Sequence, residues 1–252
     1  MPDAALPLIQ PEALNALPNV VAAFTTRRGG VSLPPFGSLN LGLSTNDDAE
    51  HVAENRRRVG AALGFPAAQW AIAGQVHGDA IQHVEAPGLY PGYDGLVANK
   101  HGLLLCISAA DCAALLFADA EAGVLGACHA GWRGTVARIA PQTVARMVKL
   151  GADPARIRVF VSPCISSENF EVGPEVAAQF DDAFVVHRPE WPRPHVDLKA
   201  TLRAQLLGAD VQADHLHIST ACTYATTDTF YSYRAEGGTT GRMMGFIGLR
   251  RG

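Results

Sequence analysis

The chain has 252 residues, of which 48% are hydrophobic and 17% charged, and 24 acidic against 20 basic side chains give a net charge of −4. This apolar share is enough for a large core, so the composition excludes a disordered chain. The mild negative charge provides no overall attraction for nucleic acid or an anionic membrane. At about 150 residues per domain the length allows one or two domains. We expect one α/β domain over residues 1–252, with its core from about residue 20 to 250.

The apolar runs and the cysteines indicate the cellular location of the protein. The longest runs, 102–110 and 112–118, fall short of the roughly 20 residues that a membrane span needs. The proline-containing first 19 residues have no basic side chain, which is not typical of a secretion signal. Five cysteines form an odd set without the spacing of a small disulfide scaffold. We therefore expect free thiols, a reducing compartment and a cytoplasmic protein.

Short apolar runs alternate with helical patterns along the chain, and no repeat or linker-like run separates them. In chain order, the patterns predict a helix over 48–63, strands over 71–77, 81–85, 103–108, 114–117 and 124–129, a helix over 135–150, a strand over 158–162, a helix over 198–207, and strands over 215–219 and 244–249. Asn46 or Asp47 is expected to cap the first helix, which Gly64 closes. Pro141 is expected to break or kink the second.

The strands between residues 71 and 129 follow one another without room for a helix, so they cannot all be parallel. This order predicts a central mixed, largely antiparallel sheet flanked by helices. Neither G-x-G-x-x-G nor G-x-x-x-x-G-K-[ST] occurs in the chain. The sequence is therefore not typical of a doubly wound nucleotide-binding fold.

His77, Cys112 and His129 each lie at or just beyond the end of an apolar run, where a sheet presents side chains to a cleft. Two imidazoles and one thiolate are a suitable ligand set for zinc, and three protein ligands leave a fourth position open, as in catalytic sites. Their separations of 35 and 17 residues contain no paired motif. From spacing alone, buried and hydrogen-bonded side chains remain the alternative. Alternation along the strands assigns Cys106 and Cys128 to the core.

Arginine beside glycine marks candidate anion sites, because glycine lets the backbone approach a ligand and a helix start offers free N–H groups. The candidates are Arg133 in the 129–135 segment, Arg28 in the 25–30 segment, and Arg234 with Arg242 around the 237–241 segment. The alternative for each segment is a turn, with its arginine in a salt bridge or in solvent. Trp132 is a candidate for stacking on a flat heterocycle, with core packing as the alternative.

Several short segments occur in a characteristic order: TTRRGGVS at 25–32, LNLG at 39–42, DD at 47–48, VAENR at 52–56, QVHG at 75–78, ADC at 110–112, HAGWRG at 129–134, FEVG at 170–173, SYR at 232–234 and TGR at 240–242. In this order they resemble the purine nucleoside phosphorylase family of the YfiH or YlmD type. Older names for this family are laccase-domain protein and multi-copper polyphenol oxidase. The resemblance extends from about residue 20 to 250.

The resemblance implies a fold related to the cysteine hydrolase domain of cytotoxic necrotizing factors. It also implies zinc at the positions of His77, Cys112 and His129. The implied activities are phosphorolysis of adenosine, inosine and methylthioadenosine, with adenosine deamination as a second reaction, and some members are linked to peptidoglycan editing. Two departures leave the pocket shape open: Ala113 replaces the usual proline after the Asp-Cys pair, and 166–169 reads SSEN in place of a cysteine-containing segment.

We therefore expect a zinc-dependent enzyme for small molecules, in which the histidines and Cys112 hold the metal. Asp111 is expected either to carry a proton or to orient a ligand. The side chains expected to bind phosphate and purine are Arg28, Arg133, Arg234, Arg242 and Trp132. No nucleic-acid or membrane partner is expected, and the oligomeric state is left open.

Three alternatives accompany this hypothesis. In the first, Cys112 is the nucleophile and a histidine the base of an amidase that edits peptidoglycan precursors. In the second, the protein is a copper polyphenol oxidase, for which only His215 and His217 resemble a further histidine pair. In the third, it is a non-catalytic scaffold whose zinc has a closed shell of four protein ligands.

Overall fold

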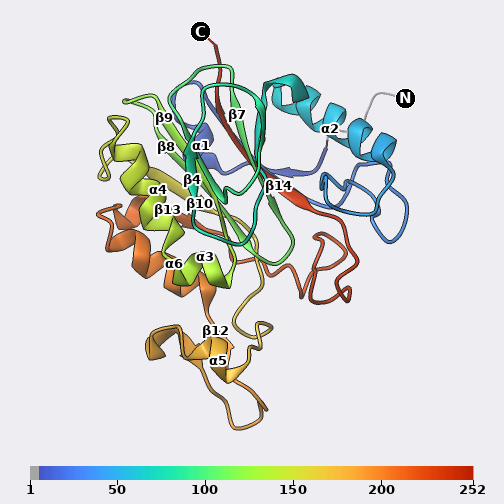
Figure 1. Cartoon of the computed structure of the whole chain (residues 1–252), viewed down its shortest axis with the longest axis vertical. Helices are drawn as coiled ribbons and strands as arrows, with labels where there is room; N and C mark the ends of the chain where they lie inside the picture. Colours follow the sequence, from blue (N-terminus) through green and yellow to red (C-terminus); the bar gives the residue numbers. More distant parts are fainter. Residues whose placement is uncertain (1–5, 252) are drawn as a thin grey trace.

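The computed structural model describes residues 6–251 and places the strands in two large sheets and one small sheet (Figure 1). The first sheet contains, in spatial order, β1 (Leu8–Ile9), β2 (Val20–Thr25), β14 (Met243–Leu249), β7 (Leu104–Ala109), β3 (Trp70–Ala73) and β5 (Gly88–Tyr90). The second contains β13 (Leu216–Ile218), β10 (Arg158–Val161), β8 (Ala113–Asp119), β9 (Val124–Ala130), β6 (Gly95–Ala98) and β4 (Ile81–His83). The small sheet pairs β11 (Val185–Val186) with β12 (His195–Val196).

Most neighbouring strands are antiparallel, as predicted. In the first sheet β2, β14 and β7 form an antiparallel centre that β3 extends in parallel. In the second, β10, β8, β9 and β6 are antiparallel, with parallel strands β13 and β4 at the edges. The prediction of one central sheet is wrong, because the strands between residues 71 and 129 divide between two sheets. Alternation along a strand gives its two faces but does not identify its neighbour.

The two sheets pack face to face and helices cover both outer faces (Figure 1). Apolar side chains between the sheets, among them Phe24, Ile107 and Leu116, form the central core. The second sheet is covered by α4 (Ile139–Val148) and α6 (Leu198–Leu207), and the first by α2 (Ala49–Leu63). The molecule is therefore a mixed α/β fold of four layers, and burial of apolar surface between the layers is its main source of stability.

The predicted first helix is confirmed as α2, although its cap is Asp48 and neither Asn46 nor Asp47. The carboxylate of Asp48 accepts a hydrogen bond from the backbone N–H of Glu50, and Gly64 ends the helix at φ 73°. The predicted helix over 135–150 is broken into α3 (Trp132–Val136) and α4, with Arg138 between them at φ 63°. Pro141 lies in the first turn of α4, where its missing N–H costs no helical hydrogen bond. The predicted break is thus confirmed.

The remaining elements are short: α1 (Glu12–Asn15), α5 (Pro174–Ala177), and the 3-10 turns η1 (Ala67–Gln69), η2 (Asp182–Phe184) and η3 (Ala213–His215). In Figure 1 the segment with α5 and β12 projects below the sheets. This projection has a small core of its own, which includes Phe170, Phe180 and Val196. No helix in residues 6–251 combines the length and the apolar character that crossing a membrane requires.

Candidate functional site

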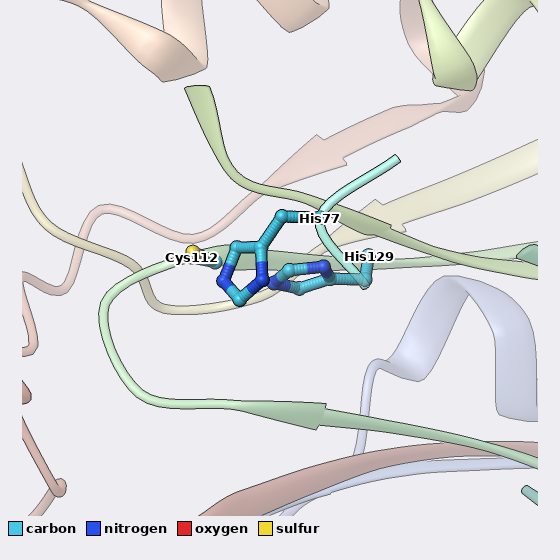
Figure 2. A group of neighbouring side chains, drawn as sticks. All are labelled: His77, Cys112 and His129. Carbon is cyan, nitrogen blue, oxygen red and sulfur yellow. The ribbon is translucent and has the colours of Figure 1, made fainter. Parts of the chain in front are cut away.

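His77, Cys112 and His129 converge at one end of the two sheets, and we call them the His-Cys-His cluster. Their nitrogen and sulfur ligand atoms all lie within 4.8 Å of one another. The imidazole rings are 4.9 Å apart between centroids and are inclined at 85°. Figure 2 shows the two rings next to each other, with the sulfur of Cys112 beside them. Residues far apart in the chain thus form one constellation.

Each member of the cluster lies on a different element. His129 is on β9, and Cys112 is in the turn between β7 and β8. The strand predicted to continue to His77 ends at Ala73, so His77 is on the following loop. Gln75 and His77 have positive φ values of 43° and 61° in this loop. A strained loop conformation persists only when neighbouring groups hold it in place.

Asp94 is the group that holds both histidines. Its buried carboxylate accepts hydrogen bonds from the backbone N–H groups of Val76, His77 and Gly78, at 2.9, 3.1 and 2.9 Å. The same carboxylate lies 2.8 Å from Nδ1 of His129. These hydrogen bonds, led by that with His129, outweigh the effect of burial and lower the pKa of Asp94. Asp94 is therefore charged, and it directs Nε2 of His129 towards the cluster.

Two further contacts set the position of the cluster. The side-chain amide of Gln75 donates to the backbone oxygen of Ser108 and accepts from its N–H, both at 2.8 Å. This pair ties the loop of His77 to β7. Gly131 leaves room for the thiol, because a Cβ on this residue would lie 2.8 Å from Sγ of Cys112. A larger residue at position 131 would displace the sulfur.

The thiol of Cys112 and the imidazole of His129 shift each other's ionisation. Burial alone would raise the pKa of Cys112, but nearby His129 and His77 lower it to about 6. Burial alone would lower the pKa of His129, but Cys112 and Asp94 raise it to about 9. In the absence of a metal the pair therefore favours a thiolate beside an imidazolium. The thiolate is also the form of cysteine that binds metals and acts as a nucleophile.

The cluster lies in a cleft of about 800 Å³. Four exposed apolar side chains line this cleft: Leu43, Val76, Leu89 and Tyr233. Its charged lining consists of three arginines and one carboxylate, together with the histidines: Arg56, Arg234, Arg242 and Asp111. The cleft therefore combines metal-type ligands, apolar surface and an excess of positive charge.

The predicted anion-binding arginines separate into two groups. Arg234 and Arg242 line the cleft, whereas Arg28 and Arg133 are not among its lining residues. Arg28 forms an exposed 2.7 Å ion pair with Asp228. The guanidinium of Arg133 lies 4.3 Å above the ring of Trp132. The structure thus places only two of the four predicted arginines in the lining of the cleft.

Trp132 and Asp111 have surroundings that their sequence context does not reveal. Trp132 lines a second hollow of about 270 Å³, which shares Phe170 and Arg234 with the main cleft. The carboxylate of Asp111 accepts from the Thr223 hydroxyl at 2.6 Å and from the backbone N–H of Arg234 at 2.7 Å. Both of its oxygens are engaged with the protein, which favours a positioning role over proton transfer.

The donor set of the cluster fits a soft divalent metal. It offers two imidazoles and one thiolate, and the Asp94 contact is the outer carboxylate bond that metal-ligating histidines commonly make. In residues 6–251 no fourth His, Cys, Asp or Glu joins this group. Three protein ligands leave a coordination position for water or substrate. The cluster could therefore bind a metal.

Sequence reasoning missed Asp94, and it included Arg56 only in the 52–56 segment of the resemblance, not among the site residues. Asp94 directly precedes β6, a strand of four residues that the sequence analysis does not predict. The feature of the sequence that points to Asp94 is a charged residue just before a short apolar run. Arg56 interrupts the apolar positions of a correctly predicted helix, and this irregularity was visible in the sequence.

Comparisons with known proteins place the chain in a family. A family model described as multi-copper polyphenol oxidoreductase laccase matches residues 21–250. A Deinococcus radiodurans protein named purine nucleoside phosphorylase is 50% identical over 250 residues, which cover 98% of this chain and 94% of that protein. Escherichia coli purine nucleoside phosphorylase YfiH is 36% identical, with 91% and 94% covered.

A solved structure agrees with these relatives. The crystal structure of YlmD from Geobacillus stearothermophilus has a TM-score of 0.86 and 37% sequence identity, and the match covers 92% of this chain and 93% of that one. Both the sequence and the arrangement of layers are therefore shared over nearly the whole length. The chain belongs to the laccase-domain family that includes the purine nucleoside phosphorylases of the YfiH and YlmD type.

Proposed function

We propose that the protein is a zinc-dependent purine nucleoside phosphorylase. Its substrates in this proposal are adenosine, inosine and methylthioadenosine, and deamination of adenosine is a second activity. The names of its relatives support the phosphorylase assignment. The single observation that carries the proposal is that the His-Cys-His cluster and three arginines face the same cleft. Such a cleft suits a reaction between an anion and a polar heterocyclic substrate.

His77, Cys112 and His129 are the proposed zinc ligands and the centre of catalysis. When bound there, the metal supplies a Lewis acid that polarises an oxygen or lowers the pKa of a water. Asp94 holds the ring of His129 and the loop of His77, so both nitrogens keep their direction. Asp111 fixes the turn of Cys112 against Thr223 and the backbone of Arg234. A multi-copper oxidase needs further histidine clusters, and in residues 6–251 the His-Cys-His cluster is the only group of three or more metal-type ligands.

The cleft arginines have an electrostatic role in the proposal. Phosphorolysis builds positive charge on the ribose and negative charge on the departing purine, so the enzyme must hold phosphate close to the glycosidic carbon. Arg242 is the proposed phosphate ligand, and Arg234 contributes positive charge at the junction with the second hollow. Tyr233 and the apolar rim offer a surface for the purine. Arg28, Arg133 and Trp132 lie outside the main cleft and are left out of this set.

The first experiment tests the reaction itself. Purified protein is incubated with adenosine, with and without phosphate, and adenine, ribose-1-phosphate and inosine are separated by chromatography. We expect adenine only when phosphate is present, and inosine as the product of deamination. The Cys112→Ala variant is expected to lose at least about a thousandfold in both rates, since it removes one ligand of the cluster. A fully active variant contradicts the zinc mechanism and every thiol mechanism.

A second function is supported by the ionisation of Cys112. A thiolate with a pKa of about 6, next to a protonated His129, is the arrangement of a cysteine nucleophile. The implied relation to cysteine hydrolases and the editing of peptidoglycan precursors belong to this alternative. Metal analysis separates the two functions. Protein that lacks zinc, cleaves a peptide-type amide and is inactivated by alkylation of Cys112 supports the amidase.

We also place the protein in the cytoplasm. All five cysteines are free, and Cys112 needs to stay reduced in either mechanism. Fractionation of the native cells, with the protein detected by antibody, tests this location.

A further inference from the structure

Arg56 occupies a position on α2 where the helical pattern favours an apolar residue. Val52, Val59 and Leu63 lie on the same buried face, and Arg56 between them is only 9% exposed. Removing a guanidinium from water is costly unless opposite charge or several hydrogen bonds compensate. A buried arginine in an apolar stripe therefore needs a reason that helix packing does not provide.

The contacts of Arg56 within the protein satisfy only part of its guanidinium. Nε and Nη2 both donate to the backbone oxygen of Leu41, at 3.0 and 2.6 Å. The guanidinium also lies 5.9 Å from the centre of the Trp70 ring. In residues 6–251 no carboxylate is within ion-pair distance of Arg56, although it lines the main cleft. Its charge is thus unpaired by protein and faces the cavity.

Arg242, which directly precedes β14, also lacks a carboxylate partner for its guanidinium within residues 6–251. Its Nη1 donates to the backbone oxygens of Thr240 and Gly241, at 2.8 and 3.0 Å. Its guanidinium lies 5.6 Å from the centre of the Tyr233 ring. Within the described part of the chain it also has no carboxylate partner. Burial lowers the pKa of both arginines, although Tyr233, Cys112 and Asp111 offset part of this effect for Arg242.

One short segment brings the two arginines together. The oxygen of Leu41 binds Arg56, while its N–H donates to the backbone oxygen of Arg242. The next residue, Gly42, packs on the stem of Arg242, where a Cβ would lie 2.8 Å from Cγ. The N–H of Arg242 itself donates to the side chain of Asn40. Residues 40–42 therefore anchor the guanidinium of Arg56 and the backbone and stem of Arg242, and both arginines line the cleft.

We propose that Arg56 and Arg242 form the binding site for the phosphate group in this cleft, with Arg56 as a specificity residue that neither the sequence pattern nor the relatives' names assign. This inference rests on the proposed phosphorylase function and gives its anion a location. A phosphate oxyanion supplies the opposite charge that both guanidiniums lack, and arginine binds phosphate through several directed N–H groups. The two sources of this group are inorganic phosphate and the phosphate of ribose-1-phosphate.

The test measures phosphate binding apart from turnover. Inorganic phosphate and, in a separate arm, ribose-1-phosphate are titrated calorimetrically into the holoenzyme without nucleoside, with acetate as a control for general anion binding. We expect Arg242→Met and Arg56→Met each to weaken phosphate binding by about tenfold or more. Arg56→Lys keeps the charge and is expected to be intermediate. The control is Arg146→Gln, which removes one positive charge from an exposed position on α4. This variant is expected to leave phosphate binding unchanged.

Steady-state kinetics separates a binding role from a structural one. If Arg56 binds phosphate, its variants raise the KM for phosphate much more than the KM for adenosine. Arg56→Lys then raises the KM for phosphate less than Arg56→Met does. Denaturation curves confirm that the variants are folded. Phosphate affinity and phosphate KM within about twofold of wild type in both methionine variants would overturn the inference.

The outcomes for the site and for the proposed function are distinguishable. If the wild-type protein catalyses phosphorolysis and the arginine variants have an unchanged KM for phosphate, this binding site is rejected. The proposed phosphorylase function is then retained. Arginine-dependent phosphate binding in a wild-type protein that does not convert adenosine supports the site and rejects the phosphorylase. Acetate binding as strong as phosphate binding rejects selectivity for phosphate.

Discussion

The two walls of the cleft are built differently. The His-Cys-His wall comes from residues 73–130 and is fixed by buried Asp94, by positive φ angles and by close backbone contacts. The arginine wall joins α2 to the start of β14, which lie about 190 residues apart in the chain, and uses long side chains with incomplete hydrogen bonding. Metal ligation requires short bonds from side chains held in fixed positions, whereas an anion site combines the charge and the directed N–H groups of longer arginine side chains. Substitutions in the first wall are therefore expected to have the larger effects.

Among the substitutions that test the difference between the two walls, Asp94→Asn is expected to have the largest effect on zinc affinity and on stability. An amide cannot present two acceptor oxygens to the backbone N–H groups and to His129, so the loop of His77 and the ring of His129 lose their common support. We expect zinc affinity to fall about 10- to 100-fold and the free energy of unfolding to fall by about 2 kcal/mol. Competition with a chromogenic chelator and denaturant unfolding measure the two quantities.

The control for this substitution is Asp79→Asn. Asp79 is an exposed carboxylate two residues after His77, and its side chain accepts from Gln142. It is expected to keep wild-type zinc affinity. Equal zinc affinity in Asp94→Asn and wild type would show that the ligand wall does not depend on this carboxylate.

A smaller effect is expected for Gly131→Ala. The new Cβ would lie 2.8 Å from the sulfur of Cys112 and 3.7 Å from Cδ2 of His77, so the thiol has to move. We expect a severalfold loss of zinc affinity and about 1 kcal/mol of destabilisation. The matched control is Gly78→Ala, where a Cβ would meet no atom nearer than 3.6 Å. If both variants bind zinc equally, the position of the sulfur is less constrained than this geometry indicates.

The smallest effect on stability and phosphate binding is expected for Arg28→Gln. This substitution tests whether Arg28 belongs to the arginine wall. The sequence suggested this residue as a phosphate ligand, but it is exposed and paired with Asp228 outside the cleft. Exposed ion pairs contribute little, so we expect less than about 0.5 kcal/mol of destabilisation. The KM for phosphate is expected to stay unchanged. A tenfold rise in this KM would extend the proposed phosphate site to the 25–30 segment.

The amino-acid sequence determined the local features of this protein. Apolar periodicity located α2, α6 and the strands β7 to β10, and Pro141 predicted the break between α3 and α4. The placement of His77, Cys112 and His129 at the ends of apolar runs indicated one shared site. These features are readable because they follow from periodicity, helix geometry and ligand chemistry within short windows.

Only the tertiary structure decided how these pieces meet. Pairing between distant strands produced two sheets where one was predicted, and it made β2 and β14 neighbours although they lie more than 200 residues apart. The same long-range packing placed Asp94 behind both histidines, brought Arg56 and Arg242 into the cleft, and left Arg28 and Arg133 outside it. A side chain's residue type gives its chemistry, but its neighbours depend on how the layers pack, which no short window of sequence contains.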